Sequence, residues 1–397
     1  MTRLQCLFIA LGITTTPILA AASAVSTYDP ANPNRGVHVG IGSYLPLSDG
    51  ESQFSGHFTY DNNDVLGSGD GFYFHLNPDY THITMTDRGY APYSGYTIVN
   101  LFSHITDQTR VEHSGGEKIR DEEYDIRAYE AEIGRGMFFA PHIRGELAFA
   151  IGGQDYSGTT AQAPPEEEED DENGEAEVDA EGFIAPADNN TYHLRARLIA
   201  GGLSEDRHYQ PKTSHMALLE LEYTLRDKSE SWGPAADPYG APGSSSTKLA
   251  LLMRGYHNYP QTTLGYRFQM GVSSGLDRDS KYRIGGGLTH DENAPSLPGW
   301  YQDEIAASHY ALGGMSASRK LFPFVGSHVV GFGRANLLYF SNSTSDGTTH
   351  GSDFVTGYSL GVSTPAFLAG RIVGQLDYSP DADHDGMGML VQYEKKW

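Results

Sequence analysis

Apolar and polar residues alternate through most of this chain, and this pattern restricts the fold more than any other feature. It is clearest over residues 264–272, where every second residue is apolar: Leu264, Tyr266, Phe268, Met270 and Val272. Residues 143–151, 192–198 and 219–226 repeat the pattern. Successive side chains of a β-strand point to opposite faces, so the alternation predicts strands with one apolar and one polar face.

A soluble β-sandwich alternates in the same way, but two features favour a transmembrane β-barrel. The predicted strands run to about 10 to 14 residues, which is the length of a tilted membrane strand. The segments between them alternate in length, as those of outer-membrane barrels do. The long polar segments are 152–189, 227–245, 276–307 and 342–352, and the short ones include 259–261, 323–325 and 365–367.

The strand count predicts an all-β protein, a transmembrane antiparallel β-barrel of sixteen strands. The strands are expected near residues 36–45, 54–62, 70–77, 79–87, 95–105, 120–134, 138–151, 190–203, 213–226, 246–258, 262–275, 308–322, 326–341, 353–364, 368–379 and 386–397. One of them should alternate poorly, because Glu130 and Glu132 stand where apolar residues are expected. The last strand contains Tyr393 and ends on Trp397, which looks like the signal that such barrels present to the barrel-assembly machinery, although Lys395 interrupts it.

Composition excludes several other classes of protein. The chain of 397 residues has 27 basic and 51 acidic residues and a net charge of -24, whereas a nucleic-acid-binding protein should be basic on one face. Cys6 is the single cysteine, so a disulfide framework is excluded. After the N-terminus no apolar stretch reaches about 18 residues, so membrane-spanning helices are not expected either.

Residues 1–24 are typical of a signal peptide. Arg3 supplies the positive charge, an apolar run follows, and small residues with an A-x-A site close the segment. We expect cleavage after Ala24, which leaves residues 25–397 as a barrel domain without cysteine. The expected location is the outer membrane of a Gram-negative bacterium.

Two acidic segments could bind cations. Residues 166–181 hold eleven acidic residues in sixteen positions, and we favour a solvated, disordered loop tip over a cation or cationic-partner site. Asp381, Asp383 and Asp385 match the first half of a calcium-binding loop. The twelfth position of that loop is Gln392 rather than a bidentate Glu, so this is a weak metal candidate and no cofactor is expected.

Enzymatic activity is not expected. Residues 357–361 form a G-x-S-x-G sequence, but a nucleophile elbow needs a strand, a sharp turn and a helix, and Ser359 stands within an alternating strand. The 16 histidines are scattered, and none shows metal-ligand spacing on one face.

Charged residues on the polar faces of the predicted strands should point into the lumen. They are Arg144, Glu146, Arg195, Arg197, Glu220, Glu222, Arg254 and Arg267. They could line a substrate path, clamp an inserted loop, or simply form the polar interior of a large barrel. Their mixed signs favour internal salt bridges over an ion-selective ring.

Four short motifs in the C-terminal third resemble those of a known family. Residues 282–287 read YRIGGG, 297–301 LPGWY, 310–322 YALGGMSASRKLF and 324–333 FVGSHVVGFG. Their order resembles the barrel of the bacterial surface antigen superfamily, which includes the barrel-assembly core protein, two-partner secretion translocators and patatin-like autotransporters. The resemblance implies sixteen strands and a sixth outer loop, here 276–307, that folds into the lumen and is followed by five strands.

The resemblance also indicates which loop residues carry the motif: Tyr282, Ile284, Gly285, Gly286, Leu297, Pro298, Gly299 and Trp300. In the superfamily an Arg at the loop tip pairs with an acidic residue in the lumen. Pro298 takes the place of that Arg, which puts this lock in doubt and makes the patatin-like branch the closer likeness. There is no room for POTRA or patatin domains, so a stand-alone barrel is expected.

The function implied by the resemblance is assistance to protein translocation or insertion at the outer membrane, with the first and last strands forming a weak seam. The partners would be outer-membrane lipid, the barrel-assembly machinery during biogenesis and a periplasmic or secreted client protein. Two alternatives stay open. A porin-like solute channel could also use an inserted loop, and a surface-exposed interaction protein could use the acidic loop 152–189.

Overall fold

The computed structural model describes most of the chain after residue 34. The described ranges are 35–47, 53–62, 71–77, 80–88, 95–105, 108–114, 117–140, 142–158, 183–202, 212–228, 230–234, 243–276, 280–286, 295–300, 305–341, 353–366, 370–382 and 386–396. The predicted signal peptide, the acidic segment 166–181, Asp383, Asp385 and Trp397 lie outside these ranges.

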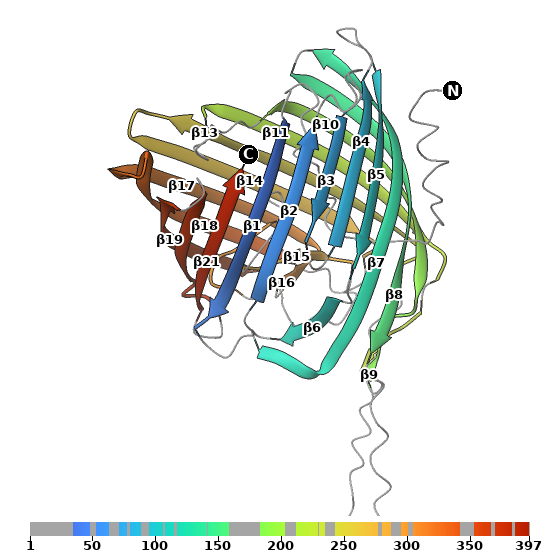
Figure 1. The fold of residues 1–397 in the computed structure, drawn as a ribbon. Coiled ribbons are helices and arrows are strands. Elements are labelled where there is room, and N and C mark those ends of the chain that lie inside the picture. Colours follow the sequence, from blue (N-terminus) through green and yellow to red (C-terminus); the bar gives the residue numbers. More distant parts are fainter. Residues whose placement is uncertain are drawn as a thin grey trace, which may run out of the picture.

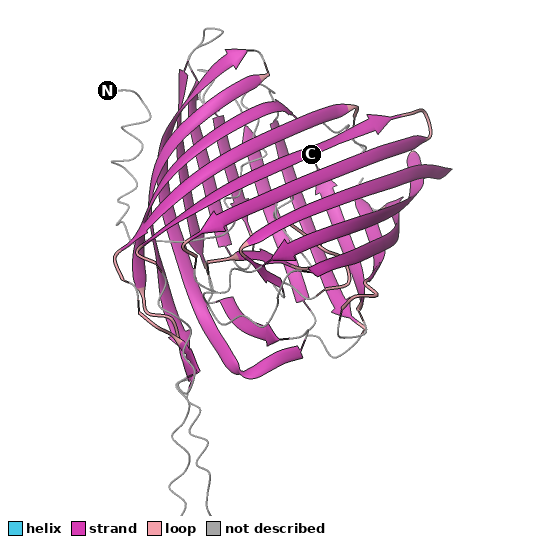
Figure 2. Ribbon diagram, turned by 180° about the vertical axis from the view of Figure 1, so that it is seen from behind, coloured by secondary structure: helices cyan, strands magenta, loops and turns pink. Residues whose placement is uncertain are grey.

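Sixteen antiparallel strands form the barrel wall, and the first pairs with the last (Figures 1 and 2). They are β1 (Arg35–Pro46), β2 (Gln53–Asn62), β3 (Gly71–Leu76), β4 (Tyr80–Arg88), β5 (Gly95–His104), β7 (Glu117–Ala140), β8 (Ile143–Gly158), β10 (Asn189–Gly202), β11 (Ser214–Arg226), β13 (Ser245–Asn258), β14 (Thr262–Ser274), β17 (His309–Phe324), β18 (Ser327–Ser341), β19 (Asp353–Pro365), β20 (Arg371–Tyr378) and β21 (Met387–Lys396). This confirms the predicted closed barrel and its strand count. Within the described ranges, no helix is long and apolar enough to span a membrane.

Five further short strands are described. β6 (Gln108–Ser114) pairs with the first half of β7, while β5 pairs with its second half, so β5 and β6 together oppose one long strand. β9 (Phe183–Ile184) pairs with β12 (Gly233–Pro234), and β15 (Tyr282–Ile284) pairs with β16 (Ile305–Ala307). The last pair lies inside the outline of the barrel (Figure 1).

One expectation about β7 was wrong, because the strand does not end near residue 134 but continues to Ala140. The expected break in its apolar–polar pattern is present. The inner face carries the buried Tyr124, Ile126 and Ala128 and then changes to Glu130 and Glu132, while Ala131 and Ile133 are exposed on the outer face.

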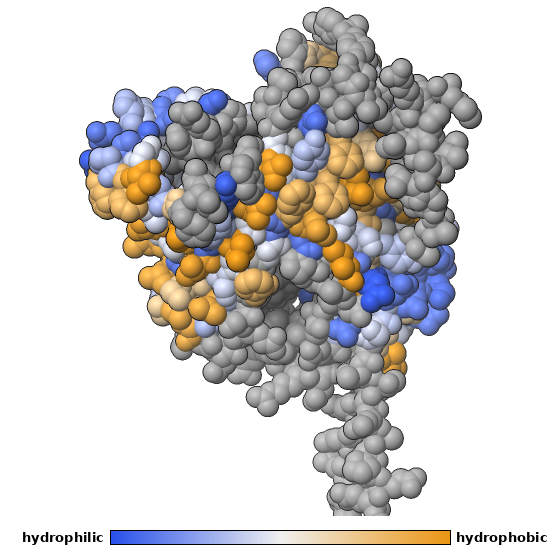
Figure 3. Space-filling view, in the orientation of Figure 1, coloured by the Kyte–Doolittle hydropathy of each residue, from blue (hydrophilic) through white to orange (hydrophobic). Residues whose placement is uncertain are grey.

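The outer surface of the barrel is apolar. On β14, Leu264, Tyr266 and Phe268 are between 39% and 45% exposed, whereas Gly265 and Gln269 on the opposite face are buried. Figure 3 shows apolar side chains gathered in patches on the front of the barrel. Such an apolar surface matches lipid rather than water. The closed barrel meets the second requirement of a membrane, because it leaves no unpaired strand edge. The chain is an outer-membrane β-barrel.

The seam between the first and last strands is well paired. Nine residue pairs join β1 to β21, from His38↔Lys396 to Pro46↔Gly388, and the amide of Leu47 extends the ladder by donating to the carbonyl of Met387 at 2.9 Å. Only five pairs join β2 to β3 among the described residues. The expected weakness of the seam is therefore not seen in its pairing.

Aromatic rings lie on glycines across the inner wall. Tyr96 covers Gly136, Tyr310 covers Gly271, and at the seam Tyr44 covers Gly388. An added Cβ at any of these glycines would collide with the ring. This cross-strand arrangement fills the space that the glycine leaves and fixes the register of the two strands.

Substitution of Gly136 by Ala should destabilise the barrel by about 2 kcal/mol, the usual cost of overpacking, because Tyr96 is almost fully buried and has to leave its position. The free energy of unfolding in urea, followed by the mobility of the unheated protein on a gel, measures this. Gly374→Ala is the matched control, because a Cβ there meets no atom within 4 Å. Equal destabilisation by both variants would contradict the role of the ring.

Candidate functional site in the barrel lumen

The predicted lumen charges share the inner face of neighbouring strands, at positions that alternate with the exposed apolar residues. Arg144, Arg195, Arg197, Glu220 and Arg254 are at most 8% exposed. The side chains of Glu146 and Glu222 are 9% and 12% exposed, and Arg267 is half-buried. A side chain that lined a wide aqueous channel would be more exposed than this.

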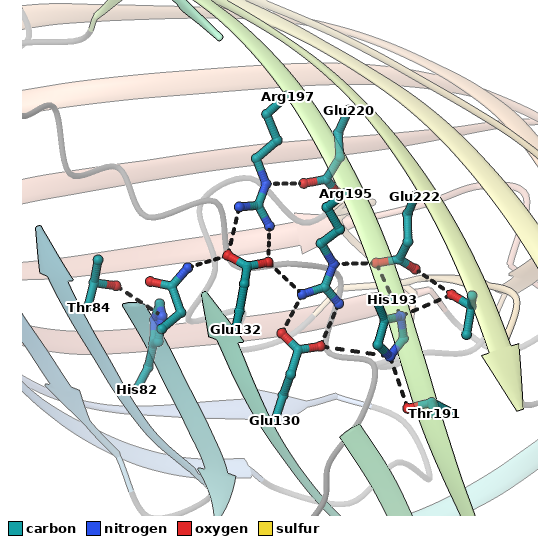
Figure 4. A network of polar contacts seen from close by, with 12 residues as sticks. His82, Thr84, Glu130, Glu132, Thr191, His193, Arg195, Arg197, Glu220 and Glu222 are labelled. Carbon is teal, nitrogen blue, oxygen red and sulfur yellow. Dashed lines mark hydrogen bonds and ion pairs between the residues drawn. The ribbon is translucent and has the colours of Figure 1, made fainter. Parts of the chain in front are cut away.

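Arg195 on β10 is the centre of an ion-pair network that Figure 4 shows from close by. Its Nε donates to Oε2 of Glu222 at 2.6 Å, and its Nη2 donates to Oε2 of Glu130 at 2.5 Å. Its Nη1 also donates to Oε2 of Glu132 at 3.0 Å. The carboxylates come from β11 on one side and from β7 on the other, so the guanidinium joins strands that are not neighbours in the sheet.

Arg197 makes the second layer of the network. Its Nη1 and Nη2 donate to the two oxygens of Glu132 at 2.9 Å each, and its Nε donates to Glu220 at 2.5 Å. Glu146 lies 3.8 Å from Arg197 and accepts a hydrogen bond from Tyr96 at 2.6 Å. The side chain of Glu132 is only 1% exposed, so its charge depends on these donors.

Further polar side chains extend the network at both ends. The ring nitrogens of His193 lie 3.0 Å from the hydroxyls of Thr191 and Thr224, and the ring is 3.8 Å from Glu222. On the other side, Asn100 of β5 donates to Glu132 at 2.6 Å. The interactions therefore connect β5, β7, β8, β10 and β11, and they brace this half of the wall from within.

A row of histidines was missed from the sequence. His38, His57, His75 and His82 stand on four neighbouring strands, β1 to β4. The ring centroids of His38 and His57 are 4.7 Å apart, and those of His57 and His75 are 5.9 Å apart. The description of the histidines as scattered was therefore wrong for these four. No group of side chains that could hold a metal ion is found in the part of the chain that the structure describes.

The described parts of segment 276–307 pack against the inner face of the wall. Ile284, Leu297, Trp300 and Ile305 are buried in one apolar cluster. The wall contributes Leu312 of β17, Leu338 of β18 and Val355 of β19 to the same cluster. Residues 277–279, 287–294 and 301–304 of this segment lie outside the described ranges.

Backbone hydrogen bonds hold the two motif-bearing parts of the segment together. The amide of Gly286 donates to the carbonyl of Trp300 at 3.1 Å, and the amide of Leu297 donates to that of Gly285 at 2.8 Å. Tyr282 donates to the carbonyls of Leu249 and Val272, each at 3.3 Å. Burial raises the pKa of Tyr282 above its usual range, so the phenol stays neutral and can donate.

The tip of the segment docks by close backbone contact. Gly299 has a φ of 85°, and an added Cβ would collide with the backbone around Ser379 and Gly386 at the β20–β21 turn. Pro298 lies against Gly357 of β19 in the same way. Pro298 and Gly299 are therefore held by the fit of the backbone rather than by charge.

Two polar contacts hold Ser296, which precedes this tip in the chain. Asn336 of β18 donates to the carbonyl of Ser296 at 3.1 Å. The guanidinium of Arg267, one of the predicted lumen charges, donates to the hydroxyl of Ser296 at 3.4 Å.

The other predicted site residues lie apart from this region. Asp381 accepts hydrogen bonds from the amide and hydroxyl of Thr356, both at 2.6 Å, so its carboxylate is engaged within the protein. Its partners in the calcium pattern fall outside the described ranges, and the metal site stays a prediction. Tyr393 on β21 lies over Gly370, and its role as an assembly signal is likewise untested.

Removal of Arg197 should be strongly destabilising, because Glu132 would lose a bidentate partner in a buried position. We expect Arg197→Ala to lower the free energy of unfolding by about 3–5 kcal/mol. Arg135→Ala is the matched control, because this Arg is exposed and donates only to Thr97 in the structure. Adding Glu132→Gln to Arg197→Ala should restore part of the loss, and no recovery would contradict the pairing.

Comparison with known proteins shows similarity in fold without similarity in sequence. No family model and no curated protein matches the sequence. BamA from Haemophilus ducreyi lacking POTRA domains 1–3 superposes with a TM-score of 0.58 at 11% identity, over 92% of this chain and 70% of that one. The structural resemblance to the bacterial surface antigen superfamily, inferred above from short motifs, is thus confirmed at the level of the barrel fold.

Two further solved structures have the same fold. CdiB from Acinetobacter baumannii superposes with a TM-score of 0.52 at 9% identity, over 91% of this chain and 60% of that one. CdiB from Escherichia coli gives 0.51 at 10% identity, over 92% and 64%. The chain spans less than two thirds of the length of either CdiB protein.

Proposed function

We propose that this chain, an outer-membrane barrel with the fold of BamA and CdiB, assists the translocation or insertion of a polypeptide at the outer membrane. The observation that carries the proposal is that the described parts of segment 280–307 form one buried apolar cluster with residues of β17–β19. A loop that only narrows a solute channel has no need of such a cluster.

The way the segment is held suits a removable plug. It rests on the wall through side-chain packing and a few hydrogen bonds, and its two strands pair with each other rather than with the wall. Displacing it would break none of the wall-strand pairings. The remaining ladder from β1 round to β21 could stay closed while the lumen opens.

The other half of the lumen supports a closed resting state as well. The network around Arg195 and Arg197 fills the inner face of β7–β11 with paired charges. These groups are bound to opposite-charge partners and offer no row of like charges to a passing ion. We therefore place a porin-like role second and a periplasmic or secreted client protein first among the candidate partners.

Displacing the loop tip should open the lumen. Gly299→Val places a side chain against the backbone at Ser379 and Gly386, so we expect frequent large openings in a planar bilayer where the parent protein shows small or rare ones. Gly326→Ala is the control, because Gly326 also has positive φ, 77°, but no atom lies within 4 Å of an added Cβ.

The same recordings distinguish the alternatives. A large, steady conductance of the parent protein would favour a porin and contradict the hypothesis that the segment plugs the lumen. Unchanged small conductance in Gly299→Val, with folding verified on an unheated gel, would show that the docked tip does not control the lumen.

A further inference from the structure

One hairpin of the barrel extends past its neighbours. The last pair between β14 and β17 is Thr262↔Arg319, and the last pair between β18 and β19 is Val330↔Ser363. Residues 321–329 therefore form a hairpin with no neighbouring strand on either side among the described residues. It projects at the left of Figure 1, in orange, at the end of the barrel that carries the short turns.

A β-bulge turns the apolar residues of this hairpin outward. Lys320 pairs with Val330 and Phe322 pairs with Val329, so Leu321 is the extra residue. Leu321 lies against Gly331, which is on the outer face of β18. Phe322 thus joins Leu321 on the outer side, instead of alternating with it.

The exposed apolar surface continues to the tip. Leu321, Phe322 and Phe324 are 53%, 55% and 48% exposed, and Val325 is 73% exposed. Phe324 pairs with Ser327 and so shares the face of Phe322. The same outer face carries Met315, 74% exposed, further along β17.

The turn itself places an apolar residue where local geometry opposes it. Phe324 pairs with Ser327, so Val325 and Gly326 form a two-residue turn, with φ values of 44° and 77°. Such turns favour Asn-Gly, because both residues have positive φ, and a β-branched residue is strained there. Val325 is the single non-glycine residue with positive φ in the described ranges. The exposed valine therefore carries a conformational cost.

The position and charge of the hairpin indicate lipid as its occupant. Its apolar face lies on the same outer side of β17 as the exposed Met315 and Ala317. Arg319, exposed on the outer side, stands directly before it, where a cationic group can contact lipid phosphates while its stem lies on apolar surface. The short turns of such barrels face the periplasm, where the leaflet consists of phospholipid.

We infer that the apolar tip, defined as Leu321, Phe322, Phe324 and Val325, inserts into the phospholipid leaflet at the short-turn end of the barrel. It anchors the β17–β18 side of the wall against that leaflet. The inference is independent of the function proposed above, since it concerns the lipid-facing side of the wall and not the lumen.

A fluorescent probe at the tip tests the inference. With Cys6 replaced by Ser, Val325→Cys is labelled with an environment-sensitive dye in the full chain and reconstituted into vesicles of phosphatidylcholine and phosphatidylglycerol. We expect blue-shifted emission, several-fold stronger quenching by a nitroxide placed shallowly on the acyl chain, and protection from aqueous iodide. Gln261→Cys, in the exposed β13–β14 turn, is the matched control and should be quenched by iodide instead.

A second substitution separates insertion from simple hairpin stability. Val325→Asn suits the turn better, so it should stabilise the hairpin while weakening insertion, read as several-fold weaker nitroxide quenching of a dye at Phe324→Cys. Iodide access at residue 325 equal to that at residue 261 would overturn the inference, and so would unchanged quenching at residue 324 in the Val325→Asn variant. Either result would place the tip in water or against a protein partner.

Discussion

A β-sheet in lipid has to pair every backbone amide and carbonyl without the help of water, and the closure of β1 onto β21 is the step that makes this possible. Closure also divides the chain into an apolar outer face and a polar inner face, because side chains alternate along each strand. The charges inside, the glycine–tyrosine contacts and the docked segment all occupy the space that closure creates.

The interior is braced in two different ways. On the side of β5–β11 the brace belongs to the wall itself, since Arg195 and Arg197 join carboxylates on strands that are apart in the sheet. On the side of β17–β19 the brace is a separate segment that packs against Leu312, Leu338 and Val355. The side chains of the first brace belong to the wall strands and cannot leave them. The second brace is held by apolar contacts, which another apolar chain could replace.

Local patterns predicted the wall and failed where the information was non-local. Alternation located all sixteen strands, because it depends only on neighbouring residues. The reason why Glu130 and Glu132 interrupt the apolar pattern could not be predicted, because their partners are arginines on β10, more than 60 residues away. The histidine row was missed for the same reason, since each of four strands contributes one ring, although their shared inward positions on successive strands were a usable signal. Docking of Leu297 and Trp300 followed only from the family resemblance, because their contacts on β17–β19 are distant in sequence.

The apolar residues that segment 280–307 packs against belong to the barrel wall and not to the segment. When the segment leaves, Leu312, Leu338 and Val355 remain on the wall as an apolar strip among polar neighbours. A passing chain with apolar residues at suitable spacing would compete with the segment for that strip. Under the proposed function, the resident segment would be an intramolecular competitor at high effective concentration, and a client chain would have to bind the strip more tightly than the segment does.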